Sequence, residues 1–147
     1  MNTKELKIKG AIFFERIEEG FSEYKDEIMV FQEEEAKEYF GKLIQEYGWE
    51  NGYADFYYYK LPEEARERVN AILVAEEIEY IDGLLVESAE DIIFPLDDML
   101  LQIIVKLNAE ELLFSTIYFL ENGKKKRSTW WGNYNKEYYC FTDKESA

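Results

Sequence analysis

Apolar side chains recur with helical spacing in three segments of the chain. Between residues 33 and 47 they fall at i, i+4, i+7, i+8 and i+11, which places them on one face of a helix. A second helix is predicted to begin at Pro62, because proline lacks the N–H that the first helical turn leaves unpaired. The third and strongest apolar stripe lies near residues 97–108, and Asp97 is a good N-cap for it. We therefore predict three helices that each bury one face.

The C-terminal part of the chain has the pattern of a sheet. β-branched and aromatic residues concentrate near residues 112–120, 126–132 and 137–142, and turn-forming residues separate these runs. This pattern predicts a three-stranded antiparallel meander. Shorter runs near residues 26–31 and 53–60 predict two further strands.

Two turns set the predicted register of this meander. Asn122-Gly123 is typical of a two-residue type I′ turn, and counting outward from it pairs Trp130 with Ser115. A second turn near residues 133–136 then places Tyr139 beside Trp130. Because side chains alternate between the two faces, these pairings predict two aromatic rows on opposite faces of the sheet.

Composition favours one folded domain. The chain has 147 residues, of which 47% are hydrophobic and 17% aromatic, so it is too apolar for a disordered protein. Residues 5–14 and 78–94 fit both helix and strand patterns, and periodicity does not decide them. We predict a single α+β domain over residues 1–147, in which an antiparallel sheet packs against about three helices.

Several absences define the expected location and exclude most familiar catalytic sites. With one cysteine, Cys140, the chain can form no internal disulfide, and it shows neither a signal peptide nor a membrane-spanning apolar run, so we expect a cytoplasmic protein. It has no histidine, which removes the commonest general base and most zinc sites. Its glycines are not spaced as a phosphate-binding loop. We expect no enzyme activity, no catalytic residue, no cofactor and no metal.

Three motifs allow both a functional and a structural interpretation. Asp97-Asp98 could ligate magnesium or calcium, but an acidic helix start is commoner. Trp130 and Trp131 suggest a stacking platform, although adjacent strand residues point to opposite faces and core packing is their ordinary role. The basic run 124–127 suggests a nucleic-acid patch, but its place after a turn favours a solvated turn that protects a sheet edge. The structural interpretation is favoured in each case.

Charge is the most distinctive property of the chain. It has 32 acidic and 17 basic residues, for a net charge of -15, and residues 1–111 carry the whole acidic excess. Between Arg68 and Lys106 there are nine carboxylates and no positive charge, which makes a strong local negative field. Such a surface repels nucleic-acid phosphates and anionic membranes, so we expect it to bind neither directly. The sign of the charge favours basic proteins, polyamines and cations as partners.

We therefore expect a non-catalytic acidic protein that occludes a basic partner. Immunity or antitoxin proteins that inhibit bacterial toxins are of this kind, and a nuclease toxin is a fitting target because its cleft is basic in order to hold phosphates. The analogy rests on size, charge and the missing catalytic groups. Carboxylates and one tyrosine from the acidic stretch form the predicted partner-binding set: Glu76, Glu77, Glu79, Tyr80, Asp82, Glu87, Glu90 and Asp91.

Two alternatives remain open at this point. The chain could be a small-ligand-binding or carboxylate-dependent enzymatic domain, with its site between the helices and the aromatic sheet; it would then be stabilised by a small molecule. It could also be a DNA-mimic inhibitor, whose carboxylates are spaced like duplex phosphates. Regular spacing of these charges in the structure would favour the DNA-mimic alternative, and the sequence cannot supply that geometry.

Overall fold

The fold is α+β, as predicted. The computed structural model describes the backbone of residues 1–88 and 91–144, and the side chains of these residues except 85–88. In the described part of the chain, six strands form one antiparallel sheet in the order β1-β6-β5-β4-β2-β3. The strands are β1 Lys25–Val30, β2 Gly52–Asp55, β3 Ile93–Pro95, β4 Thr116–Phe119, β5 Ser128–Gly132 and β6 Glu137–Thr142. The helices are α1 Thr3–Ile8, α2 Ile17–Glu23, α3 Glu33–Tyr47, α4 Glu63–Ile72, α5 Ala75–Ser88 and α6 Asp98–Ala109.

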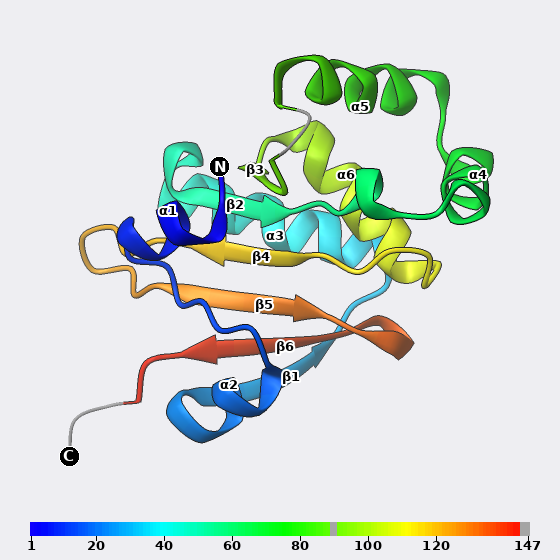
Figure 1. Cartoon of the computed structure of the whole chain (residues 1–147). Helices are drawn as coiled ribbons and strands as arrows, with labels where there is room; N and C mark the ends of the chain where they lie inside the picture. The colour runs from blue at the N-terminus through cyan, green and yellow to red at the C-terminus, as the bar shows by residue number, and fades with distance from the viewer. Residues whose placement is uncertain (89–90, 145–147) are drawn as a thin grey trace.

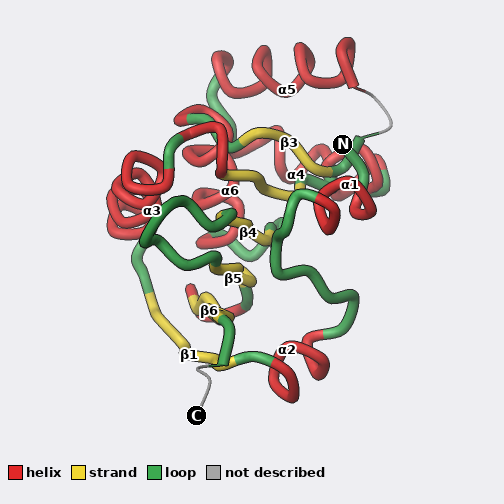
Figure 2. The backbone as a smooth tube through the Cα atoms, turned by 90° about the vertical axis from the view of Figure 1, so that its left-hand side faces the viewer, coloured by secondary structure: helices red, strands yellow, loops and turns green. Residues whose placement is uncertain are grey.

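The sheet separates two unequal layers. Helices α3 and α6 pack on one face, whereas α1, the N-terminal segment (residues 9–16) and α2 lie across the other (Figure 1 and Figure 2). Strand β5 and the residue before it hold this segment, because Thr129 Oγ1 donates to the Ile12 carbonyl at 2.7 Å and Arg127 Nη1 donates to the Gly10 carbonyl at 3.0 Å. The N-terminal segment is therefore part of the folded domain.

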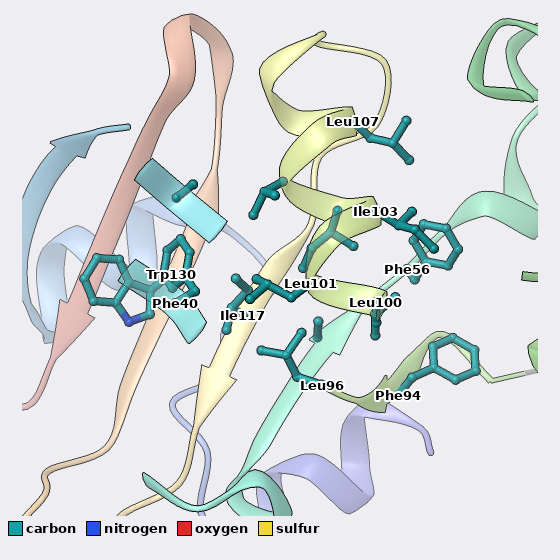
Figure 3. Close-up of a cluster of buried hydrophobic side chains, with 14 of the residues drawn as sticks. Phe40, Phe56, Phe94, Leu96, Leu100, Leu101, Ile103, Leu107, Ile117 and Trp130 are labelled. Carbon is teal, nitrogen blue, oxygen red and sulfur yellow. The ribbon is translucent and has the colours of Figure 1, made fainter. Parts of the chain in front are cut away.

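The main hydrophobic core lies between the sheet and the α3–α6 layer (Figure 3). Phe40 of α3 is fully buried and meets Trp130 of β5 edge-on, with ring centroids 5.2 Å apart. Helix α6 adds buried aliphatic side chains, among them Leu100 and Ile103. Truncating a buried phenylalanine such as Phe40 to alanine typically costs about 3–5 kcal/mol of stability. No helix in the described ranges has both the length and the apolar character to cross a membrane.

The three predicted helices are confirmed. α3 spans residues 33–47, and the apolar face predicted for it is buried. α4 begins directly after Pro62, which occupies its N-cap position. Asp97 caps α6, because its Oδ1 accepts a hydrogen bond from the Leu100 amide at 2.8 Å. Local capping and periodicity were sufficient signals at these positions.

The two undecided segments each contain a helix followed by extended chain. α1 begins with a capping box between Asn2 and Glu5 and is followed by Gly10, whose φ of 101° only glycine adopts readily. Residues 11–14 then run along the sheet without joining it. The second segment contains most of α5 and, after the undescribed residues 89 and 90, strand β3.

The strand predicted over residues 53–60 is only partly correct. β2 ends at Asp55, and Tyr58–Lys60 form a single 3₁₀ turn instead. The hydroxyl of Tyr58 donates to Asn70 Oδ1 of α4 at 2.8 Å, and that of Tyr59 donates to the Ile81 carbonyl of α5. Contacts with two helices therefore override the β propensity of the tyrosine run.

The predicted register of the β4–β5 hairpin is wrong by two residues. Asn122 pairs with Lys125, so the two turn residues are Gly123 and Lys124, and Trp130 faces Ile117. Gly123 has a φ of 59°, whereas Asn122 is not in the left-handed region; its side chain donates instead to the Tyr47 carbonyl at 2.7 Å. This tertiary hydrogen bond moves the turn by one position. An even shift leaves every side chain on its predicted face.

The next register is wrong by one residue, and this exchanges the faces of β6. Trp130 faces Cys140, and Trp131 faces Tyr139. The cause is a connection in which Asn135 and Lys136 both have positive φ, near 60°. Tyr139 therefore lies on the same face as Trp131, away from the main core.

Candidate functional site

The predicted partner-binding residues centre on α5, which stands at the end of the domain above α6 (Figure 1). Glu76, Glu79 and Asp82 are exposed on this helix. We call these three residues the acidic face of α5. Val74, just before the helix, is also exposed. Together they present negative charge next to an apolar contact.

Glu77 is a correction to the predicted set, because its side chain is fully buried. Its Oε1 accepts hydrogen bonds from Lys106 Nζ at 2.6 Å and from the Val74 amide at 2.9 Å, and its Oε2 accepts one from Gln102 Nε2 at 2.9 Å. Burial alone would raise the pKa of Glu77, but these donors outweigh it and hold the pKa below its ordinary value. Glu77 thus joins α5 to α6 and is not available to a partner.

Tyr80 and Asp91 also have partners within the chain. The Tyr80 hydroxyl donates to Asp97 Oδ2 at 2.8 Å, and burial together with this carboxylate raises the tyrosine pKa. Asp91 forms an ion pair with the amino group of Met1 at 2.8 Å. The side chain of Glu87 and all of Glu90 lie outside the described residues. Of the predicted set, the structure leaves the acidic face of α5 as the part that is exposed.

The basic run 124–127 does not form an open cationic patch. Lys125 pairs with Glu46 at 2.8 Å, and Arg127 makes a two-bond contact with Asp143 at 2.7 and 2.8 Å. The run joins β4 to β5, which are both interior strands, so the prediction that it protects a sheet edge is wrong. Lys125 and Arg127 of this run therefore pair with carboxylates of the same chain.

A cavity of about 620 Å³ lies on the sheet face that the N-terminal segment crosses. Its lining includes the ends of β2 and β5, the start of β4, and residues of α1 and α2, so it lies on the opposite side of the sheet from the main core. This differs from the predicted position of a ligand site between the helices and the aromatic sheet. Two carboxylates and no lysine or arginine are among the lining residues: Thr3, Phe13, Phe14, Glu15, Ile17, Asp55, Tyr57, Phe114, Ser115, Thr116, Tyr118, Trp131, Gly132, Asn133 and Tyr139.

Asp55 is the buried carboxylate of this cavity. Its side chain accepts a hydrogen bond from the Thr116 amide at 2.8 Å, which extends the β2–β4 contact beyond the last backbone pair. Burial raises its pKa to about 7, although hydrogen bonds from the Thr116 backbone and side chain oppose the shift. Within the described ranges, no basic group forms an ion pair with Asp55.

Aromatic rings form the walls around Asp55. Phe14 stacks on Trp131 with centroids 5.3 Å apart, and Phe13 lies 6.2 Å from Tyr118. Burial and the nearby Asp55 carboxylate both raise the pKa of Tyr118. The same two causes raise the pKa of Tyr57, which is 37% exposed. The cavity therefore combines negative potential with π surfaces.

The two tryptophans lie on opposite faces, as predicted. Trp130 is buried in the main core, and its indole N–H donates to Ser128 Oγ at 3.1 Å. Trp131 lines the cavity. Neither this cavity nor Asp55 was found by sequence reasoning. The one local signal was a single carboxylate inside the aromatic run 53–59, and a lone acid there does not by itself indicate a site.

The other residues considered for a metal site or for catalysis, Asp97 and Cys140, have structural roles or are buried. Asp97 caps α6, which is the ordinary role of an acidic residue at a helix start, and it also accepts a hydrogen bond from the Tyr80 hydroxyl. Cys140 is buried, and burial raises its pKa to about 12, with Glu27 adding to the shift. Among the residues that the structure describes, no three acidic or cysteine side chains are grouped so as to hold a metal ion.

Comparison with known proteins adds no family assignment. No family model, no curated protein and no solved structure is significantly similar to this chain.

Proposed function

We propose that this chain is a non-catalytic binding protein that occludes a basic partner protein through the acidic face of α5. The proposal rests on one observation: some side chains of this helix make contacts within the protein, and others are exposed and unpaired. Glu77 and Tyr80 attach α5 to α6, whereas Glu76, Glu79 and Asp82 point to solvent and, among the described residues, form no ion pair. A helix that is fixed to α6 and presents unpaired carboxylates is suited to a preformed basic surface.

Electrostatics gives the proposed mechanism. A net charge of -15 attracts a basic partner over long distances and raises the association rate. At contact, each carboxylate of the acidic face can accept hydrogen bonds from arginine or lysine, and Val74 can lose its exposed apolar surface. No chemical step is needed, because covering the basic surface is sufficient.

A nuclease toxin is the partner class that we propose, with this chain as its immunity or antitoxin protein. Enzymes that cleave nucleic acids carry basic clefts to hold phosphates, and the acidic face is complementary to such a cleft in charge. This assignment rests on charge complementarity and on the residue types that the chain lacks.

Affinity capture tests the proposal. The tagged full-length chain is incubated with host lysate at low salt and eluted with a salt gradient, and bound proteins are identified by mass spectrometry. We expect one basic protein in stoichiometric amount, eluting at a defined salt concentration. A diffuse set of cationic proteins would contradict the proposal and would mean that the charge serves solubility.

A matched pair of variants assigns the contact to α5. The triple variant Glu76→Gln, Glu79→Gln, Asp82→Asn removes three charges from the acidic face. Its control, Glu18→Gln, Glu19→Gln, Glu23→Gln, removes three exposed charges from α2, which lies at the opposite end of the domain (Figure 1). We expect the first variant to lose the partner and the second to keep it. Equal losses would show that total charge, rather than α5, governs capture.

A further inference from the structure

We propose that the cavity between the N-terminal segment and the sheet binds a small organic ammonium ion, with Asp55 as its counter-ion and the aromatic walls around its apolar body. This site lies on a different face from α5 and does not depend on the function proposed for that helix. The charge of the lining, the shape of the cavity and the surroundings of Asp55 support this site.

Asp55 is a buried carboxylate, and no cation among the described residues pairs with it. It is only 7% exposed, and the Thr116 amide donates a hydrogen bond to it at 2.8 Å. An asparagine side chain would accept that hydrogen bond equally well and would avoid the cost of burying a charge. Structural bridging between β2 and β4 therefore does not explain why the residue is an acid. A positively charged ligand would explain the acid, because it offsets the cost of desolvating the carboxylate.

The lining selects the sign of the ligand. Asp55 and Glu15 both face the cavity, which has no basic lining residue. An anion would meet two carboxylates and no donor of positive charge, so phosphates and carboxylic acids are excluded as ligands. The net charge of -15 adds to the same preference.

The walls select an organic cation over a metal ion. Calcium and magnesium prefer six or more oxygen ligands, whereas about half of this lining is aromatic. Aromatic faces attract ammonium groups through their quadrupoles, and Tyr57, Tyr118 and Trp131 supply such faces. The chain itself shows this contact nearby, where Lys7 Nζ lies 5.1 Å from the ring centroid of Phe13.

The dimensions suit a small molecule. A volume of about 620 Å³ falls within the range of roughly 300–1,000 Å³ that is typical of small-molecule sites. Asp55, Thr116 and Tyr118 are buried, whereas Glu15 and Tyr57 are exposed at the mouth. An amine would enter head first, place its ammonium group at Asp55 and leave its apolar body between Trp131 and Tyr57.

Binding of matched amines and alcohols tests the proposal without any variant. The full-length chain is titrated with butylamine, phenethylamine and tryptamine, and with the neutral analogues n-butanol and phenethyl alcohol, while Trp131 is observed by NMR. We expect saturable shifts for the amines, with phenethylamine binding more tightly than butylamine. The alcohols should bind at least about tenfold more weakly, because they cannot pair with the carboxylate. Absence of amine binding, or equal binding of amines and alcohols, would overturn the proposal.

Two variants then assign the contacts. Asp55→Asn keeps the acceptor for the Thr116 amide and should lower amine affinity at least about tenfold, while alcohol binding stays unchanged. Tyr57→Ala at the mouth should weaken phenethylamine more than butylamine, because the larger body is held by the rings. The control Asp26→Asn changes an exposed carboxylate of the edge strand β1 and should leave all affinities unchanged. Wild-type affinity in Asp55→Asn would show that the amines bind elsewhere.

Discussion

Lys106 of α6 donates a 2.6 Å hydrogen bond to Glu77 of α5, whose carboxylate is fully buried. This pair and the second donor Gln102, together with the Tyr80–Asp97 hydrogen bond, link the two helices. Gln102 in turn accepts from Lys37 Nζ of α3 at 3.2 Å, so the link reaches a third helix. Lys106 therefore supplies the positive charge that pairs with Glu77 and helps to hold the acidic face of α5 in place.

Removing that cation should destabilise the whole domain. In Lys106→Met the Glu77 carboxylate would stay buried without its cationic partner, and breaking a buried pair in this way typically costs about 3–5 kcal/mol. Denaturant unfolding measures the loss. The control Lys42→Met breaks a pair with Glu38 in which both side chains are about 70% exposed, and it should cost less than about 0.5 kcal/mol. Equal effects of the two variants would contradict the role assigned to Lys106.

The contribution of Glu77 should disappear in acid. Its folded-state pKa is lowered, so near its ordinary pKa the folded state holds fewer protons than the unfolded state. The stability that Glu77 contributes is fully present when the pH is above its ordinary pKa. This stability is lost as the pH falls through its lower pKa in the folded state. The stability difference between wild type and Glu77→Gln should therefore shrink as pH falls from about 7 to about 3. A difference independent of pH would mean that packing, rather than charge, makes Glu77 important.

Asp55 should have the opposite pH dependence. Its pKa is raised from 3.8 to about 7, so between these values the folded state holds a proton that the unfolded state has released. Stability from this group is fully present below the unfolded pKa and is lost as pH rises through about 7, on the order of 4 kcal/mol in total. Tyr57 and Tyr118 face Asp55 but have raised pKa values, so they stay neutral over this range.

The matching measurement compares wild type with Asp55→Asn. Unfolding free energies are determined from about pH 5 to about pH 9. The difference between the two proteins should grow in favour of the variant as pH rises, because asparagine carries no charge to bury. Parallel curves would show that Asp55 is ionised in the folded protein throughout this range.

Reversing charge on the acidic face should slow association with the captured partner. Glu79→Lys with Asp82→Lys is expected to lower the association rate about tenfold at low salt and to flatten its salt dependence. Stability should change by less than about 0.5 kcal/mol per site, because both residues are exposed. Stopped-flow kinetics at several salt concentrations provides the test, with the α2 variant as control. An unchanged association rate would exclude this face as the contact.

Gly132 should tolerate no side chain while Asn108 is present. A Cβ at Gly132 would lie 2.0 Å from Asn108 Oδ1 and 3.0 Å from the Ser115 carbonyl oxygen. Gly132→Ala should therefore cost about 1–3 kcal/mol. In a double-mutant cycle with Asn108→Ala, the alanine at position 132 should cost measurably less, which unfolding experiments can detect. Additive losses would show that the clash with the Ser115 backbone dominates.

The helices were predictable because their signals are local. α3, α4 and α6 each carry periodicity and a starting residue within their own sequence. The register of the β4–β5 hairpin could not be predicted in this way, because a hydrogen bond from Asn122 to Tyr47, 75 residues away in the chain, shifts the turn after β4. The 3₁₀ turn after β2 likewise depends on contacts of tyrosines with α4 and α5.

The site residues likewise include one with a local sequence signal, Glu77, and one without, Asp55. Glu77 has the helical spacing of Ile81 and Leu84, so its place on the apolar face could have been read from the sequence, and Lys106 is the first base that follows it. Asp55 offers no such signal. Its neighbour Thr116 lies 61 residues away, and the Phe13 and Phe14 walls come from a segment whose conformation periodicity left undecided.

The pairing of β1 with β6 has a consequence for how the chain is made. Lys25 faces Thr142 and Val30 faces Glu137, so β1 can pair with β6 only after nearly all of the chain up to residue 142 has been synthesised. Ile28 and Val30 of this strand are exposed even in the folded protein. We expect the neighbouring acidic residues Asp26 and Glu27 to act as gatekeepers that keep unpaired β1 strands of different chains apart until the sheet closes.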